Sequence, residues 1–475
     1  MAVEFNYPTS NKNTYTKPST GASILNFLKG LIGLINPENA KTSYTFAVCC
    51  IVLALLSACS ISPQDEGVAT TLAFSPSDDT RFSNEVMNVA PFLPANQVKR
   101  HEQCNIKTAD KGFKTSHEVN YTKYGWEKRI AHQTEFFDIP QQEGRILIID
   151  FAKAEDALAY RYLSNDNSHN TLYEPWSSSK IFAFTGAIAE LRDQGFGART
   201  QIGGTYVADM ITSINTYEAF GTSIDNSNAL ATLFANVAGR DNLSALFYDD
   251  WLKLSTPNIY FRGAYGPSAY KPNSYEAQML DGTSSIRLQP FLNAADDPGY
   301  LNYRCESCGL TGNKPMTTLA QAEFLKRLAS HTRDPLTQHP ALEAVDVKTL
   351  FYGDGNSLGN ERFAGMSAGI SVMLQHAIAN SIQTETSTNK SAKLILDEAS
   401  QGKWRVFQKI GWGPSDTRGT TEVVVLAHVC LPYYLGGREF TVSAQVSVPN
   451  ADESLLPAAG KKMQRLLEKT MNKLL

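Results

Sequence analysis

The chain has 475 residues, of which 42% are hydrophobic and 19% are charged. This balance excludes wholesale disorder and allows a sizeable core, and the length corresponds to about two to three domains. The 43 basic and 47 acidic side chains leave a formal net charge of −4. That charge excludes a nucleic-acid-binding protein that relies on a general positive field, so we expect no nucleic-acid partner.

An uncharged apolar segment lies near the N-terminus. Residues 46–58 read FAVCCIVLALLSA, a run of 13 residues that is short for a membrane-spanning helix, which needs about 20. The run fits the apolar region of a secretory signal, and the Leu-Ser-Ala-Cys quartet that ends at Cys59 resembles the lipobox of bacterial lipoproteins. We therefore expect residues 1–58 to be a leader and Cys59 to carry a lipid. An uncleaved single-span anchor is the alternative.

The expected lipid places the protein in the cell envelope, in the periplasm and attached to a membrane. Ser60 follows the cysteine, and by analogy with bacterial lipoproteins a residue other than Asp there favours the outer membrane. Residues 24–35 form a second apolar stretch, and 40 residues precede Lys41, which flanks the main one. Either the true start lies downstream of Met1, or the leader is an unusual one.

The next segment has a different composition. Residues 60–98 are rich in Ser, Pro, Asp and Asn and show no helical or strand period. Such a composition favours a flexible tether, which we place at residues 59–98. The globular domain then covers residues 99–475.

Four cysteines lie in this domain: Cys104, Cys305, Cys308 and Cys430. Cys305-x-x-Cys308 lacks the second Cys pair or His pair of a zinc site, so we expect no metal and no other cofactor. An exported protein can form disulfides. We expect a structural disulfide that fixes a loop, with Cys305 and Cys308 as candidates, and the connectivity is open.

The first half of the domain combines two strands with a series of helices. Residues 145–152 (RILIIDFA) form an apolar, β-branched run that predicts a buried strand, and residues 157–163 predict its hairpin partner. Residues 181–191 are apolar nearly all round, which predicts a buried helix. Residues 256–316 are rich in Gly, Pro, Asn and Tyr and predict a long irregular region, which is usually functional. Further helices are predicted at 206–214, 228–237, 243–252, 317–329 and 366–378.

The C-terminal part changes to strand periodicity. Strands are predicted at 404–410, 421–430 and 439–448, and the last alternates apolar residues on one face. A closing amphipathic helix carries one apolar stripe, made of Met463, Leu466, Leu467, Met471 and Leu474. Strands from both chain ends would join one antiparallel sheet with helices on its faces and a helical subdomain between. The fold class is therefore α+β.

The segment EPWSSSK, at residues 174–180, has a chemical use. Ser177 and Lys180 stand at i and i+3, which places both side chains on one face of a helical turn. A serine hydroxyl becomes a nucleophile when an amine with a lowered pKa can take its proton. The start of the helix also offers backbone N–H groups to an oxyanion. A Ser-rich helix cap with a solvated lysine is the alternative interpretation.

The order of these elements resembles that of the penicillin-recognising serine enzymes, the class A β-lactamases and D,D-peptidases. The hairpin RILIIDFAKAEDALAYRYLSND precedes Ser-x-x-Lys, and FQKIGWG at residues 407–413 matches the Lys-Thr-Gly strand that precedes two strands and a closing helix. The resemblance covers roughly residues 140–475. It implies a β-lactamase/transpeptidase-like fold, with Ser177 as the nucleophile and Lys180 as its base.

The resemblance implies further roles. Lys409 would orient an acidic substrate, Gly411 would allow close backbone approach, and the backbone N–H groups of Ser177 and Trp412 would hold the oxyanion. A polar loop would relay the proton to the leaving group. Its residues are either 224–226 or, in the register we prefer, Asn226, Ser227 and Asn228.

Three departures from the family pattern stand in the sequence. Ile410 replaces the hydroxyl residue of the Lys-Thr-Gly motif, the polar loop lacks Ser in first place, and no residue matches the deacylating Glu of class A enzymes. His428 is expected in the core.

The hypothesis is a lipid-anchored serine hydrolase or acyltransferase acting on a small-molecule or peptidoglycan-like peptide, amide or ester. The alternative is a non-catalytic, penicillin-binding-like envelope module.

Overall fold

The computed structural model describes residues 78–96, 103–256, 258–263, 265–266, 269–289, 304–305, 310–311, 314–359, 363–383 and 389–475. The expected leader, the lipidation candidate Cys59 and the side chains of Cys305 and Cys308 lie outside this described part. No helix in these ranges has the length and apolar character needed to cross a membrane.

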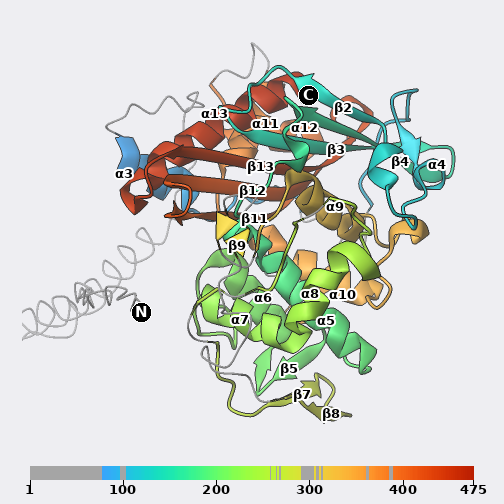
Figure 1. Cartoon of the computed structure of the whole chain (residues 1–475), viewed down its shortest axis with the longest axis vertical. Coiled ribbons are helices and arrows are strands. Elements are labelled where there is room, and N and C mark those ends of the chain that lie inside the picture. The colour runs from blue at the N-terminus through green and yellow to red at the C-terminus, as the bar shows by residue number, and fades with distance from the viewer. Residues whose placement is uncertain are drawn as a thin grey trace, which may run out of the picture. The chain divides into compact units, whose positions relative to one another are not determined.

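A mixed sheet forms the centre of the domain (Figure 1). The strand order is β1-β4-β3-β13-β12-β11, all neighbours pair antiparallel, and β2 adds to β4 in parallel. The N-terminal hairpin joins the C-terminal strands where β3 pairs with β13, which confirms the predicted sheet. The strands are β1 (Lys114–Thr115), β2 (His132–Phe137), β3 (Arg145–Ala154), β4 (Ala157–Asn165), β11 (Arg405–Ser415), β12 (Thr420–Leu431) and β13 (Arg438–Pro449).

One face of the sheet is covered by C-terminal helices. The apolar stripe predicted for the closing helix is buried, and this helix, α13, packs on β12 and β13. Ile410 lies in the same hydrophobic cluster, so the residue that departs from the family motif points into this core. The helices on this face are α11 (Met373–Ile382), α12 (Ala392–Ser400) and α13 (Leu456–Leu474).

The opposite face carries α9 and the helical subdomain, which lies below the sheet in Figure 1. The helix α5 is buried along almost its whole length, as predicted. Thr317 caps α9 by accepting a hydrogen bond from the Ala320 N–H at 3.1 Å. The helices here are α5 (Lys180–Asp193), α6 (Val207–Thr216), α7 (Ser227–Ala238), α8 (Arg240–Ala245), α9 (Thr318–Ala329) and α10 (Ala344–Tyr352).

Several predicted bounds differ from the structure. The helix expected at 243–252 begins earlier, as α8, and continues only as a π-helical turn at Leu246–Asp250. The helix expected from residue 366 starts at Met373, because a 3-10 turn at Gly365–Ala368 precedes it. The helices α10 and α12 and the strands β1 and β2 were not predicted. Nor were the smaller elements α4 (Ser116–Val119), β5 (Thr200–Ile202), β6 (Thr205–Tyr206), β7 (Glu276–Met279), β8 (Ser285–Arg287), β9 (Arg304–Cys305) and β10 (Leu310–Thr311).

The segment expected to be a tether is partly folded. The helix α3 (Asp79–Phe82) and a π-helical turn at Ser83–Met87 bury Phe82 and Met87 against Gly460 of α13. The polar composition of residues 60–98 concealed this short apolar contact. Residues 59–77 and 97–98 of the predicted tether lie outside the described part.

A disulfide joins Cys104 to Cys430, with a Cα–Cα distance of 5.8 Å. It fixes the segment before β1 to strand β12 and closes a sequence separation of 326 residues. The sequence predicted a disulfide but named Cys305 and Cys308 as candidates, and that pairing stays a prediction. The spacing of the cysteines in the sequence did not distinguish a disulfide between neighbouring cysteines from one that joins the two ends of the domain.

Candidate active site

A 3-10 turn presents Ser177. The turn covers Trp176–Ser179 and leads into α5, and the Lys180 N–H donates to the Ser177 carbonyl. Side chains at i and i+3 of a 3-10 turn eclipse each other, so Ser177 and Lys180 share one face. The predicted juxtaposition is therefore present, in a tighter turn than the α-helix expected.

The three consecutive serines differ in their contacts. The Ser178 hydroxyl donates to the Pro175 carbonyl at 2.6 Å, and the Ser179 hydroxyl donates to the Trp176 carbonyl at 2.7 Å. Both of these side chains are buried. Ser177 is half-buried and lines a cavity of about 580 Å³. Of the three hydroxyls, that of Ser177 is the one that a ligand in the cavity can reach.

Lys180 is a buried cation held by the polar loop. Its Nζ donates to Ser227 Oγ at 2.8 Å and to Asn228 Oδ1 at 2.7 Å. The side chain is fully buried, and this burial, with a smaller effect from the charge of Lys314, lowers the pKa of Lys180 well below its ordinary value. Because the cationic form is disfavoured, the amine is poised to accept a proton.

The loop before α7 uses the preferred register. Asn226 caps α7 by accepting hydrogen bonds from the Asn228 and Ala229 N–H groups, while Ser227 and Asn228 contact Lys180. Ile224, from the other register, is 82% exposed. The structure therefore brings two of the three predicted loop side chains to the amine, and the third orients the helix that carries them.

Lys409 reaches the site but not the solvent. It lies on edge strand β11 and is 1% exposed, with its Nζ 3.8 Å from the centre of the Tyr217 ring. Within the described part of the chain, Nζ has no hydrogen-bond partner. Burial and the nearby charge of Lys180 lower the pKa of Lys409 well below its ordinary value. The role of Lys409 in orienting an acidic substrate stays a prediction, and it would require the Tyr217 ring to move away from the amine.

The rest of β11 lies against the Ser177 turn. The strand runs past its predicted end at residue 410, so Gly411 and Trp412 belong to it. A Cβ on Gly411 would lie 2.7 Å from the Ser177 backbone nitrogen, so only glycine allows this approach. Trp412 lines the cavity and stacks on Tyr217 with ring centres 5.6 Å apart.

The sequence did not single out Tyr217, which covers the site. It follows the last residue of α6 in the left-handed conformation, and its hydroxyl donates to the Ile410 carbonyl at 3.0 Å. Burial raises the pKa of Tyr217, and an interaction with the nearby Ser177 side chain offsets part of this rise. No motif marked this residue, because its position depends on how α6 ends.

Two further residues come from the long irregular region. The Tyr265 hydroxyl lies 3.0 Å from Ser179 Oγ, and the Lys314 Nζ lies 4.9 Å from the centre of the Tyr265 ring. Burial lowers the pKa of Lys314 to about 8. The composition of residues 256–316 predicted a functional region. It therefore indicated the segment that contains Tyr265 and Lys314, but not these two residues.

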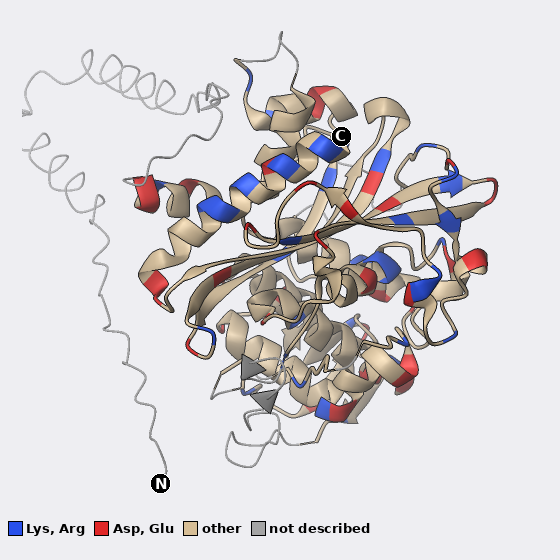
Figure 2. Cartoon of the chain, turned by 45° about the horizontal axis from the view of Figure 1, so that its top comes forward, with Lys and Arg blue, Asp and Glu red and all other residues tan. Residues whose placement is uncertain are grey.

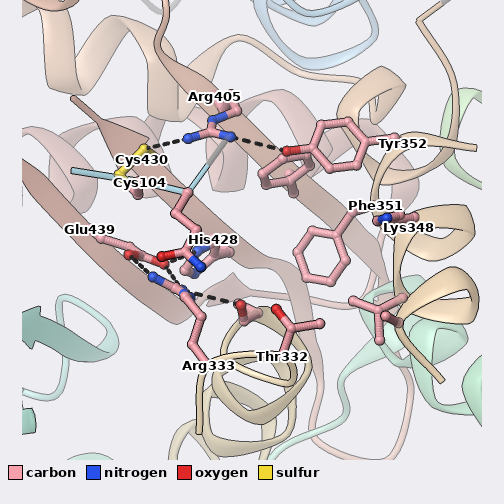
Figure 3. A pocket seen from close by; sticks show the side chains of 15 residues that line it. Cys104, Thr332, Arg333, Lys348, Phe351, Tyr352, Arg405, His428, Cys430 and Glu439 are labelled. Atoms are coloured by element: carbon pink, nitrogen blue, oxygen red, sulfur yellow. Dashed lines mark hydrogen bonds and ion pairs between the residues drawn. A yellow bond between two sulfur atoms is a disulfide. The ribbon is translucent and has the colours of Figure 1, made fainter. Parts of the chain in front are cut away.

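A second cavity, of about 320 Å³, lies between β11–β13 and α10 (Figure 3). Arg333 and His428 both point at Glu439: Arg333 donates to Glu439 Oε2 at 2.8 Å, and the His428 Nε2 lies 3.0 Å from Oε1. The other ring nitrogen of His428 contacts Thr441 at 3.0 Å. His428 is buried with both nitrogens bonded, which confirms the predicted core role.

No family model and no curated protein matches this sequence. Among solved structures, the chain is similar to a beta-lactamase from Streptosporangium roseum, with 14% identity, a TM-score of 0.34, and coverage of 69% of this chain and 95% of that one. A class A beta-lactamase from Bacteroides cellulosilyticus has 9% identity and a TM-score of 0.36, and the match covers 70% of this chain and 93% of that one. PBP-A has 9% identity and a TM-score of 0.33, and the match covers 70% of this chain and 89% of that one. Identities and TM-scores this low carry no argument about the activity of this chain, so the proposed activity is argued from the geometry of the site.

Proposed function

We propose that this protein is a serine hydrolase or acyltransferase of the penicillin-recognising type, which forms an acyl-enzyme on Ser177. The observation that carries the proposal is the convergence of three distant segments on one cavity. Ser177, the loop at 226–228 and Trp412 line it, and the buried Lys180 bonds to that loop directly behind them.

Lys180 has the chemistry of the general base. A neutral amine has two N–H donors and one lone pair, and Ser227 and Asn228 accept the two donors. The lone pair is then left for the proton of Ser177, which stands on the same face of the turn. The Ser227 hydroxyl itself donates to the Ile214 carbonyl at 3.1 Å and would have to exchange this bond to pass a proton to a leaving group.

The edge of β11 supports the proposed oxyanion site. The N–H and C=O of one strand residue point to the same edge, and the direction alternates along the strand. The Ile410 carbonyl accepts from Tyr217, away from β12, so the Trp412 N–H, two residues on, points to the same free edge. There, with the Ser177 N–H, it would stabilise the oxygen charge that develops during acylation.

The substrate class and the location extend the proposal. A cell-wall-related peptide, amide or ester would enter the cavity, and its binding would require Tyr217 to leave the Ser177 hydroxyl. Export and a lipid on Cys59 would place the domain at the envelope, where such substrates occur. Tyr217 is thus a contact that a substrate must displace.

The test is covalent labelling of the intact protein with a fluorescent penicillin and, separately, a fluorophosphonate. The wild-type protein and Ser179→Ala, whose change removes a neighbouring hydroxyl, should be labelled. Ser177→Ala should not be. Equal labelling of Ser177→Ala and the wild type would contradict the assignment of the nucleophile.

The alternative is a non-catalytic module that keeps the fold, and the interaction between Tyr217 and Ser177 favours it, because this interaction has to break before the Ser177 hydroxyl can attack. Tyr217→Ala distinguishes the two functions. If the variant folds and still takes no label from either probe, the non-catalytic function is supported. Faster labelling than the wild type supports a covered enzyme.

A further inference from the structure

A row of cationic side chains follows one face of α13. Lys461, Arg465, Lys469 and Lys473 recur every four residues, so they lie above one another along the helix, over about 18 Å. Figure 2 shows them as blue bands along this helix. Residues 456–475 hold five basic and one acidic side chain, whereas the whole chain carries −4. Positive charge is therefore concentrated here.

Part of this charge has no acidic partner nearby. Lys461 pairs with Asp79, and Lys469 pairs with Glu143. Lys462, beside the row, donates to two backbone carbonyls, which leave its charge uncompensated. Arg465 and Lys473 are exposed and form no ion pair with any residue that the structure describes. We call this group, Lys461, Lys462, Arg465, Lys469 and Lys473, the α13 basic face.

The chain enters the domain beside this face. Asp79 of α3 contacts Lys461 at 2.5 Å, and Phe82 packs on Gly460, at the beginning of the row. Cys59, the residue proposed to carry the lipid, precedes Asp78 by 19 positions. A chain of that length spans at most about 65 Å, so a lipid on Cys59 keeps this end of α13 within that distance of a bilayer.

We infer that the α13 basic face docks onto a membrane surface that carries anionic phospholipid headgroups. The inference rests on the proposed lipid attachment at Cys59. Attraction between basic side chains and an anionic bilayer acts within a Debye length, about 8 Å at physiological salt. The attached lipid keeps the domain near the surface, so diffusion repeatedly brings the basic face into this range. Guanidinium and ammonium groups then contact phosphodiester oxygens directly.

Docking in this way fixes the orientation of the active site. The basic face belongs to a helix on one side of the sheet, whereas α5, which carries Lys180, lies on the other side (Figure 1). The Ser177 cavity would therefore face away from the bilayer. The cavity would be open to a substrate polymer that lies beyond the membrane surface, and membrane lipids would not reach it.

The test uses the intact, lipid-modified protein bound to nanodiscs made either of phosphatidylcholine alone or of equal parts phosphatidylcholine and phosphatidylglycerol. Lysine acetylation is followed residue by residue with mass spectrometry. Lys469 and Lys473 should be acetylated several-fold more slowly on the anionic discs, and 1 M salt, where the Debye length is about 3 Å, should remove the difference. The exposed Lys111 and Lys123 serve as internal references.

Two double variants complete the test. Arg465→Glu with Lys473→Glu should abolish the protection of Lys469 on anionic discs, whereas Lys111→Glu with Lys123→Glu, which makes the same change of charge elsewhere, should keep it. Equal acetylation of Lys469 on the two kinds of disc would overturn the inference, as would protection that the first variant leaves intact. A protein that associates with neither disc instead contradicts lipid attachment, and the labelling of Ser177 is unaffected by that outcome.

Discussion

Two groups of buried ionisable side chains lie against the same sheet, and they differ in whether they have partners of opposite charge. The Glu439 carboxylate is fully paired, since Arg333 and His428 contact both of its oxygens. Around Ser177 the buried amines of Lys180 and Lys409 have no anionic partner among the described residues. Burial lowers the pKa of both, helped by the charge of Lys314 at Lys180 and by that of Lys180 at Lys409. Paired buried charges hold a structure together, whereas unpaired ones oppose folding and are kept where chemistry uses them.

The sharpest test of this contrast replaces the proposed base. Lys180→Met keeps most of the side-chain volume but removes the amine, so acylation of Ser177 by a fluorescent penicillin should slow by about 10²–10⁴-fold. Because the buried amine opposes folding, the free energy of unfolding should not fall. A variant that is labelled at the wild-type rate would show that Lys180 is not the base.

A substitution in the paired cluster around Glu439 should change the free energy of unfolding and leave the labelling of Ser177 unchanged. Glu439→Ala leaves Arg333 as an unpaired buried charge, which should lower the free energy of unfolding by about 3–5 kcal/mol. Urea denaturation followed by tryptophan fluorescence measures this change. A loss below about 1 kcal/mol would show that the cluster is more hydrated than its burial indicates.

Lys409→Met should have a smaller effect of the opposite sign. A methionine in the same place relieves the desolvation of the ammonium, so stability should be unchanged or rise by about 1–4 kcal/mol. The same denaturation experiment measures it, with the conservative Lys409→Arg as the matched variant that keeps a charge. Destabilisation by Met and not by Arg would mean that the cation holds Tyr217 in place.

The pH dependence of stability separates the two regions further. A buried lysine with a lowered pKa binds fewer protons when folded than when unfolded, so its effect on stability improves as pH rises toward its ordinary pKa of 10.5. Glu439, whose pKa its cationic partners hold at about 2, stabilises the fold above its ordinary value of 4.5 and loses that effect as pH falls toward 2. Urea denaturation at a series of pH values should show both effects. Lys180→Met should reduce the rise in stability toward alkaline pH, to which other buried lysines also contribute, and leave the loss at acidic pH unchanged.

The sequence predicted those parts of the site that depend on spacing along one element. Ser177 and Lys180 share a turn, and the resemblance to the penicillin-recognising enzymes implied that Gly411 lies close to them. The sequence did not predict the Tyr217 ring over Lys409, because Tyr217 takes this position as the left-handed residue that follows α6. Contacts made by irregular segments carry no periodic signal.

The same limit applies to the rest of the fold. Hydrophobic periodicity marked the long strands and most of the apolar helices, with errors of up to seven residues at their ends, but the helices α10 and α12 were missed. The helical turn at 79–87 was missed, because its few apolar residues gain stability only from α13. The disulfide partners were open, because two cysteines at opposite ends of the domain become neighbours only after the sheet has formed.

The bond between Cys104 and Cys430 has a consequence for biogenesis. If the chain is exported N-terminus first, as proposed, Cys104 would reach the oxidising compartment long before its partner, which follows 326 residues later. During that interval Cys305 and Cys308 would emerge and compete for its thiol. Correct pairing therefore depends either on keeping Cys104 reduced until translocation is nearly complete or on an isomerase that exchanges early, non-native bonds.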